Sequence, residues 1–317
     1  MGVHHDPQSV NLAAPSETEQ PANDPLSDVL RMVKLTGALF FLVDASSPWG
    51  EGWASVPGAH PVRFAAGDVI VFPRGDAYAM LSAPEGPADL EPGAALEFFR
   101  AMAAGRLPFV VPEGGGGDQR ARFMCGFLGC DARPFNPLLA TLPPLMHVRR
   151  PAAARHDLLD RLIEVALLEA RANRPGAQAI RLRLSELMFV EAVRRYLEAL
   201  PAEQTGWLAG LRDAGVGRAL ALLHERPAYP WTLEQLAAQS RMSRSVLAER
   251  FTRLVGQPPM QYLAHWRIQA AARLLADGAA KVSAVGIEVG YASEAAFSRT
   301  FKKVAGVSPA AWRARRS

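Results

Sequence analysis

Hydrophobic positions follow three different patterns along this chain. Between residues 25 and 150, short apolar runs such as 38–43 and 69–72 are separated by Gly- and Pro-rich turns, which is typical of the strands of a sandwich or barrel. From 152 to 200 the apolar residues recur every three or four positions, which predicts helices. After a connector at 201–210, helical spacing continues to the C-terminus.

The segment at 152–200 predicts a helical hairpin. Leu158 and Leu162 begin one apolar stripe, the chain breaks at Pro175-Gly176, and Leu184 and Leu187 begin a second stripe. Such stripes suit a cap over a barrel as well as the interface of a dimer, so both interpretations stay open.

An internal repeat lies in the C-terminal part of the chain. The stretch 243–256 recurs fifty residues later at 293–306, with a serine first, apolar residues four and eight positions on, and a glycine last. Each copy therefore predicts a helix that begins at a serine N-cap and ends at a glycine. A short helix precedes each copy, and Gly290 can supply the positive φ of a tight turn. The helix-turn-helix pattern is thus present twice.

The stretch 260–275 predicts one long helix between the two units. Its apolar stripe includes Leu263, Trp266, Ile268, Ala271 and Leu274. A rigid helix of this kind can hold two recognition helices about 34 Å apart, which is one turn of DNA. The two helices could then enter successive major grooves on one face of the duplex.

These residues resemble a known family of regulators. The stretches MSRSVLAERFTRLVGQPPMQYLAHWRIQAAARLL and GYASEAAFSRTFKKVAGVSPAAWR are similar to the AraC/XylS signature, over about 216–315. The resemblance implies a transcription regulator that binds double-stranded operator DNA, with RNA polymerase as a partner. Arg241 departs from the pattern, because the first turn of this family has a glycine there, and a side chain is expected to strain that turn by about 1 kcal/mol.

The N-terminal segment resembles the cupin-type sensory domain of such regulators. The resemblance lies in DPLSDVLRMVKLTGALFFLVDASSPWG and AGDVIVFPRGDAYAM, where Gly67, Pro73 and Gly75 fit the second cupin motif. Tyr78, however, occupies the place of the metal-binding histidine, and the His-rich first motif is missing. We therefore expect a shortened barrel without metal, cofactor or catalytic residue, and a metal-dependent cupin enzyme is the poorer alternative.

Composition and charge narrow the class of protein further. Of the 317 residues, 49% are hydrophobic and 21% charged, as in a globular protein, and no apolar run is long enough to span a membrane. Between residues 208 and 317 there are 16 Lys and Arg against 7 Asp and Glu, although the whole chain carries only +4. A basic module for a polyanion, attached to a controlling module, is expected. The scarcity of cysteine and the lack of a secretory signal predict a cytoplasmic protein.

The two cysteines, Cys125 and Cys130, lie in or beside the apolar run 123–128. If that run is a strand, their odd separation places them on opposite faces, which disfavours an intramolecular disulfide. Core thiols are the expected interpretation. A redox-responsive regulator that uses these two residues is the alternative.

An effector pocket in the N-terminal domain is a further hypothesis. Its candidate lining residues are aromatic, and in a small barrel such residues equally well form the core. The candidates are Phe40, Trp49, Phe64, Phe72 and Tyr78. The sequence names no effector for this pocket.

The outward faces of the two recognition helices supply the candidate DNA contacts. In the second helix Arg299 suits bidentate contact with guanine, and in the first Glu249 could accept from cytosine. Basic side chains at the helix margins suit phosphates. The whole candidate set is Arg244, Ser245, Ala248, Glu249, Arg253, Ala295, Ser298, Arg299, Lys302 and Lys303.

The expected fold class is therefore α+β and multidomain. A cupin-like β-barrel with a helical hairpin precedes an all-α domain with two helix-turn-helix units. The expected boundaries are a disordered tail at 1–24, the sensory domain at 25–150, the hairpin at 151–200, a linker at 201–210 and the DNA-binding domain at 211–317. Control by a small-molecule effector or by homodimerisation is expected, without membrane association.

Overall fold

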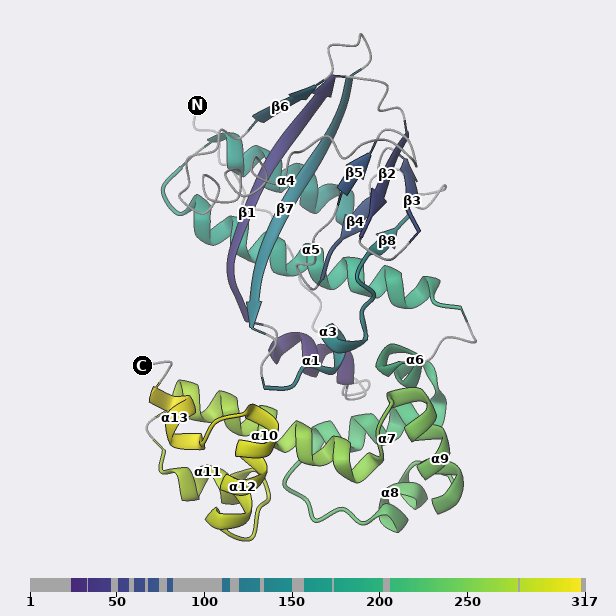
Figure 1. The fold of residues 1–317 in the computed structure, drawn as a ribbon, viewed down its shortest axis with the longest axis vertical. Helices are drawn as coiled ribbons and strands as arrows, with labels where there is room; N and C mark the ends of the chain where they lie inside the picture. The colour runs from purple at the N-terminus through teal and green to yellow at the C-terminus, as the bar shows by residue number, and fades with distance from the viewer. Residues whose placement is uncertain are drawn as a thin grey trace, which may run out of the picture.

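The computed structural model (Figure 1) places a β-rich N-terminal module beside a helical C-terminal domain. It describes residues 24–32, 34–46, 51–56, 60–65, 68–73, 79–81, 110–114, 120–131, 134–149, 157–172, 174–201, 206–278 and 280–314. The predicted tail at 1–24 thus lies outside the described residues, except for Asp24.

The strands that the structure describes in the N-terminal module form three small sheets. In the first, β1 (Lys34–Ser46) lies between β6 (Val110–Gly114), which runs parallel to it, and β7 (Arg120–Asp131), which runs antiparallel. In the second, β2 (Glu51–Ser55) lies between β3 (Val62–Ala65) and β5 (Ala79–Leu81), and in the third, β4 (Val69–Val71) pairs with β8 (Met146–Val148). The apolar runs at 38–43, 69–72 and 123–128 are thus strands, as their pattern predicts.

The predicted helical hairpin is present. Helix α4 (Leu158–Ala172) and helix α5 (Ala177–Ala199) pack on each other, and both contact β1. Gly176 begins α5 with φ +86°, a conformation that glycine adopts without strain. Leu159, Ala166 and Met188 are buried between the two helices, with Val69 of β4 packed against them, whereas Leu158, Val165 and Leu187 are exposed. The predicted stripes therefore have one packed side and one open side.

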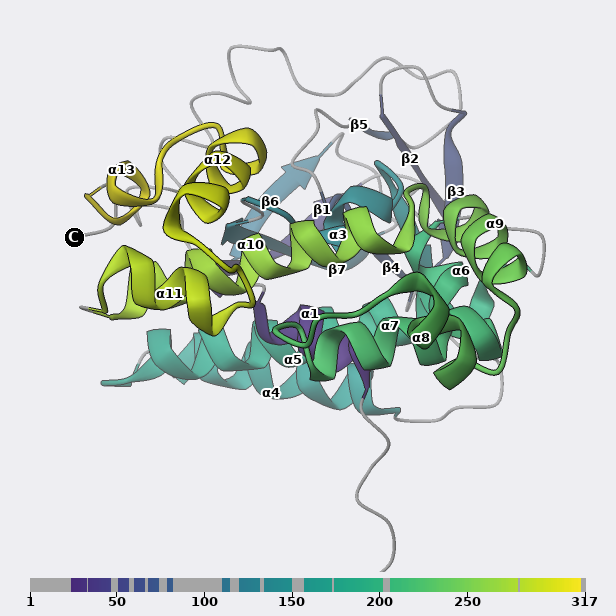
Figure 2. The same cartoon turned by 90° about the horizontal axis from the view of Figure 1, so that it is seen from below.

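The C-terminal domain consists of helices in the described range 206–314. Its first unit contains α6 (Trp207–Arg212), α7 (Ala214–Glu225), α8 (Leu233–Gln239) and α9 (Arg244–Val255). The long helix α10 (Pro259–Asp277) leads to the second unit, with α11 (Val282–Glu288), α12 (Glu294–Ala305) and α13 (Pro309–Ala314). Figures 1 and 2 show α9 and α12 near opposite ends of α10.

Two predicted boundaries need correction. Residues 25–32, expected in the barrel, form helix α1 (Pro25–Met32), which packs against α7 of the C-terminal domain. Residues 207–210, expected in the linker, belong to α6, where Trp207 is 1% exposed. In both places the apolar side chains are buried against helices that lie far away in sequence, which local patterns do not reveal.

A single apolar core joins the N-terminal module to the first unit. We call this cluster the shared core. From the N-terminal module it contains Leu26 and Val29 of α1, Leu138 and Leu139 of α3 (Pro137–Thr141), and Leu142, which follows α3. From the first unit it contains Val216, Leu220 and Leu223 of α7, Leu247 and Phe251 of α9, and Tyr262 and Trp266 of α10. The second unit has its own cluster, the C-terminal core, formed by Ile268, Ala271, Ala272, Leu275, Val285, Val289, Phe297, Phe301 and Trp312.

A chain of polar groups lies inside the shared core. The indole N–H of Trp207 donates to the Tyr262 hydroxyl (2.9 Å), which lies 2.7 Å from Nε2 of His224. Since an indole can only donate, the Tyr262 hydroxyl hydrogen is left for His224 Nε2. The N–H of His224 is then on Nδ1, which faces the Asp28 carboxylate of α1 at 3.7 Å. The polar chain thus links three buried side chains, from α6, α7 and α10, and brings them up to the half-buried Asp28 of α1.

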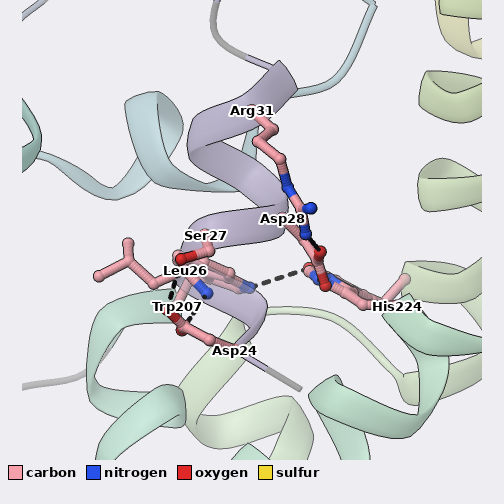
Figure 3. Close-up of polar contacts among 8 residues, drawn as sticks. Asp24, Leu26, Ser27, Asp28, Arg31, Trp207 and His224 are labelled. Atoms are coloured by element: carbon pink, nitrogen blue, oxygen red, sulfur yellow. Dashed lines mark hydrogen bonds and ion pairs between the residues drawn. The ribbon is translucent and has the colours of Figure 1, made fainter. Parts of the chain in front are cut away.

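The end of this chain joins α1 to α7. Figure 3 shows Asp28 with Arg31 of the same helix and His224 beside it. Burial lowers the pKa of His224, and Asp28 offsets this only in part. Burial by itself raises the pKa of Asp28, but His224 and Arg31 outweigh it and hold this pKa below its ordinary value. His224 is therefore kept neutral near pH 7 and Asp28 ionised.

Candidate nucleic-acid interface

The first helix-turn-helix unit is formed by α8, a tight turn and α9. Helix α8 begins with a capping box between Thr232 and Gln235. The turn is closed by a hydrogen bond from the Met242 N–H to the Ala237 carbonyl (2.9 Å), and Arg241 within it has φ +57°. Ser243 then caps α9 by accepting from the Val246 N–H. Arg241 is thus in the left-handed region, as its place in the sequence predicts.

The second unit repeats this geometry with α11 and α12. The Tyr291 N–H donates to the Gly286 carbonyl (2.9 Å), and Gly290 has φ +94°. Ser293 caps α12 by accepting from the Ala296 N–H. Both recognition helices end at a glycine in the left-handed region, Gly256 and Gly306. The predicted serine starts and glycine stops are confirmed.

The repeat is offset by 49 residues in the turns and by 50 in the recognition helices. Arg241 corresponds to Gly290 and Met242 to Tyr291, whereas Ser243 corresponds to Ser293. The second turn therefore contains one additional residue, Ala292, before its N-cap. Among the residues that the structure describes, Arg241 is the one non-glycine residue with a positive φ.

Small residues allow the helices of each unit to cross closely. A Cβ atom on Gly286 would lie 3.0 Å from the Phe297 ring, so α11 and α12 approach more closely than a larger residue permits. Ala237 occupies the matching place in the first unit and is buried. The predicted role of these small residues is therefore supported by the geometry.

On α9 the candidate residues point away from the core. Leu247 and Phe251 are fully buried, while Arg244, Ser245, Glu249 and Arg253 are exposed and Ala248 is half-buried. Arg244 Nε lies 2.9 Å from Glu234 Oε1, but both side chains are largely exposed, so this pair contributes little to stability. Arg244 can therefore exchange its carboxylate partner for a phosphate.

Arg250 has a structural contact that the sequence did not reveal. Its Nη2 lies 2.6 Å from Oδ2 of Asp213, and Asp213 also caps α7 by accepting from the Gly215 and Val216 N–H groups. Arg250 thus ties α9 to the start of α7. A carboxylate that precedes a helix is the signal by which this partner could have been found.

On α12 the outward side carries the stronger positive charge. Ala295, Arg299, Lys302 and Lys303 are exposed, and Ser298 is half-buried. Burial, with the charge of Lys303, lowers the pKa of His265 on α10. Lys303 is thus within electrostatic reach of His265, and Arg299 lies one helical turn before Lys303 on the same side of α12.

The candidate sites of the N-terminal module are only partly described. Phe64 on β3 and Phe72 after β4 are half-buried, whereas Trp49, Tyr78 and the side chain of Phe40 lie outside the described residues. Cys125 and Cys130 are in β7, opposite Phe41 and Leu35 of β1, and their side chains are likewise outside that part. Across the described ranges, no three His, Cys, Asp or Glu side chains gather as a metal site, and no helix has the length and apolar character of a membrane span.

Comparisons with known proteins support this two-module organisation. A cupin family matches residues 50–198 and a helix-turn-helix domain family matches 236–315. Over 309 residues the chain is 35% identical to a putative AraC-like transcription regulator of Streptomyces lividans, which covers 92% of this chain and 98% of that protein. Another, from Streptomyces antibioticus, is 34% identical over 311 residues with the same coverage. A crystal structure of the DNA-binding domain of AdpA with a target DNA is 33% identical, with TM-score 0.31, over 32% of this chain and 92% of that one.

These relatives bear on the alternatives left by the sequence. The fold class is confirmed, with a cupin module and a helix-turn-helix domain in the expected order. The full-length relatives are transcription regulators and not enzymes, and they give no support to a metal-dependent cupin enzyme or to a redox-responsive mechanism.

The strained turn generates a stability prediction. A left-handed backbone conformation destabilises a residue with a Cβ atom by about 1–2 kcal/mol, and a glycine avoids this strain. A glycine also increases the conformational entropy of the unfolded chain, which offsets about 0.4–1 kcal/mol of the gain in stability. Arg241→Gly should therefore raise the free energy of unfolding by about 0.5–1 kcal/mol. Urea denaturation followed by circular dichroism measures it. Arg241→Ala, which removes the charge but keeps the Cβ atom, is the control and should change little; an equal gain in both variants would refute the strain argument.

Proposed function

This chain belongs to the AraC-like transcription regulators, which are DNA-binding proteins, and its helix-turn-helix domain follows a cupin module. We propose that the chain reads its operator with both α9 and α12. The observation that carries this proposal is that two serine-capped helices with the same buried face lie near opposite ends of one helix, α10. The residues on their exposed faces belong to neither the shared core nor the C-terminal core. Such a pair suits successive major grooves.

The two helices differ in what they offer to DNA. On α12, Arg299 is the candidate base reader, with Ala295, Ser298 and Lys302 beside it. On α9, Ser245, Ala248 and Glu249 offer fewer hydrogen-bond donors, so we expect fewer base contacts there. Arg244, Arg253 and Lys303 lie at the margins, where phosphates would be met.

We further propose that the N-terminal module controls the first unit more than the second. The shared core contains apolar residues of α1 and α3 as well as of α7 and α9, whereas the described buried residues of the C-terminal core all lie within 268–312. A polar contact also ties the N-terminal module to α10, since the Phe135 N–H donates to Oε1 of the buried Gln269 (3.0 Å). An effector or a partner subunit that displaced α1 or this segment would loosen the first unit. We place this control in the cytoplasm, where the operator and RNA polymerase are; the contact with polymerase stays a prediction.

Homodimerisation through the helical hairpin is the second part of this proposal. The open sides of α4 and α5 carry five large apolar residues that are 44–66% exposed: Leu158, Val165, Leu168, Ile180 and Leu187. They recur at helical spacing along each helix, and large exposed apolar side chains gathered in one region are typical of an interface. The opposite sides of the same helices pack on each other and against Val69 of β4, which is compatible with the cap interpretation. The two interpretations of the stripes are therefore compatible.

The proposed base reader can be tested against a phosphate contact. Arg299→Ala should flatten the preference at one or two base pairs, because a bidentate contact with guanine contributes about 1–3 kcal/mol of discrimination. Lys303→Ala should weaken binding to all DNA sequences alike and reduce the slope of log affinity against log salt concentration by about 1. Titration of single-base operator variants at two salt concentrations distinguishes the two effects. If Arg299→Ala lowers affinity uniformly, Arg299 does not read bases.

The proposed control of the first unit predicts an uneven loss of affinity. The Phe135 ring lies against Tyr262 (5.7 Å between centroids) and His265 (5.2 Å) of α10, so Phe135→Ala should loosen the junction. The half-site read by α9 should lose affinity several-fold more than the half-site read by α12. Base changes in either half-site, tested by gel shift, measure this. Phe64→Ala, a half-buried phenylalanine of β3, is the control, and an equal loss at both half-sites would contradict the proposal.

The proposed dimer is tested on the open side of α4. Leu168→Glu should weaken self-association by about a hundred-fold, because a symmetric interface loses the burial of the same leucine twice, at about 1.5 kcal/mol each. Sedimentation velocity over a range of concentrations gives the dissociation constant. Ile287→Glu, in α11 and equally exposed at 67%, is the matched control. A parent chain that is monomeric throughout, or a variant that dimerises like the parent, would rule out this interface.

A further inference from the structure

Arg267 lies in α10 at the point where the two cores meet. Trp266 belongs to the shared core and Ile268 to the C-terminal core, and the two clusters have no buried residue in common. The side chain of Arg267 is only partly exposed, and it leaves α10 between the two helix-turn-helix units. Its contacts therefore bear on how the units are joined.

The guanidinium of Arg267 donates to three backbone carbonyls from two different units. Nε donates to Pro227 (2.6 Å) and Nη2 to Tyr229 (2.8 Å), both in the loop between α7 and α8 of the first unit. Nη1 donates to Gly290 (3.2 Å), in the turn of the second unit. The planar fork of arginine presents donors in fixed directions, which a lysine cannot do. One rigid group thus connects two loops that are more than sixty residues apart.

The two loops also touch each other beside this guanidinium. A Cβ atom on Gly290 would lie 2.7 Å from Cα of Ala228, closer than any real side chain permits. Gly290 therefore allows a backbone-to-backbone contact as well as the positive φ of its turn.

Both loops are themselves firmly held. In the first, Trp231 is buried and its indole N–H donates to the Arg226 carbonyl, while Arg226 lies over the rings of Tyr229 and Trp231. In the second, Tyr291 packs against Phe297 of the recognition helix α12. A displacement at Arg267 would therefore be transmitted to α12 and, through α8, to the first unit.

We propose that Arg267 is a positioning residue that fixes the second helix-turn-helix unit relative to the first and thereby sets the half-site spacing that the protein accepts. The inference rests on the proposed reading of DNA by both α9 and α12. Apolar packing on α10 places each unit on the helix, but apolar packing is non-directional. The three directional hydrogen bonds and the contact of Gly290 with Ala228 define the angle between the units. Two linked sites gain from each other only if the geometry lets both engage at once.

The test uses the full chain and a series of operators in which one base pair is inserted or removed between the half-sites. Each base pair moves one half-site by about 3.4 Å and turns it by about 35°. The parent should bind the shifted operators about 100-fold more weakly than the natural spacing. Arg267→Met should reduce this ratio to about 10-fold or less, with the base preference of each half-site unchanged. Arg267→Lys should give a ratio between those of the parent and Arg267→Met.

Two further variants separate positioning from charge and from stability. Arg273→Met removes the same charge from an exposed place on α10 and should keep the spacing ratio of the parent. Gly290→Ala leaves the charge unchanged but pushes the same contact apart, so it should also flatten or shift the spacing preference. This variant keeps the test decisive if Arg267→Met folds poorly.

The outcomes point to different errors. If the parent discriminates between spacings and both Arg267→Met and Gly290→Ala retain its ratio, Arg267 does not position the units and the inference is overturned. A uniform fall in affinity at every spacing would also overturn it, since that is the effect of lost stability alone. If the parent itself shows no preference for spacing, the proposed reading by two helices fails, and this inference fails with it.

Discussion

Four sets of contacts meet on helix α10. Tyr262 and Trp266 enter the shared core, and Ile268 and its neighbours enter the C-terminal core. Gln269 holds the N-terminal module by accepting from the backbone of the segment before α3. Arg267 connects the two helix-turn-helix units. Since one helix carries all of these contacts, neither unit can be displaced independently of α10.

The two DNA-binding units are alike in local geometry and unlike in support. The second unit buries its own residues around Phe297, Phe301 and Trp312, and the Trp312 indole N–H donates to the Ala272 carbonyl within the same unit. The first unit completes its core with α1 and α3 of the other module, and with a buried polar chain that ends at Asp28. Separation of the modules would expose the apolar side chains of α1 and α3 to water, so this junction resists partial separation. The asymmetry gives the N-terminal module a physical means of acting on one half of the DNA-binding surface.

Much of the DNA-binding domain could be predicted from the sequence because its signals are local. A serine followed by apolar residues four and eight positions later predicts a capped helix with one buried face, and α9 and α12 follow this pattern. Arg241 and Gly290 could be assigned to the turns because a tight turn restricts φ within a few residues. The apolar runs of β1, β4 and β7 were recognisable for the same reason. The helix at 25–32, inside the segment 25–150 where strands were expected, and the helix that begins at 207, inside the expected linker 201–210, were not predicted, because both pack on distant parts of the chain.

The sequence by itself thus determined the order of the modules, the starts and stops of the recognition helices and the faces they expose, since these follow from spacing over a few residues. Only the tertiary structure decided that Arg250 pairs with Asp213, that His224 lies between Asp28 and Tyr262, and that Arg267 contacts both units. These contacts join residues from 23 to 196 positions apart, as between Arg267 and Gly290 or Asp28 and His224. A charged or polar side chain shows in the sequence which partners it could accept, but the choice among them depends on which backbone the packing of the apolar cores brings within reach.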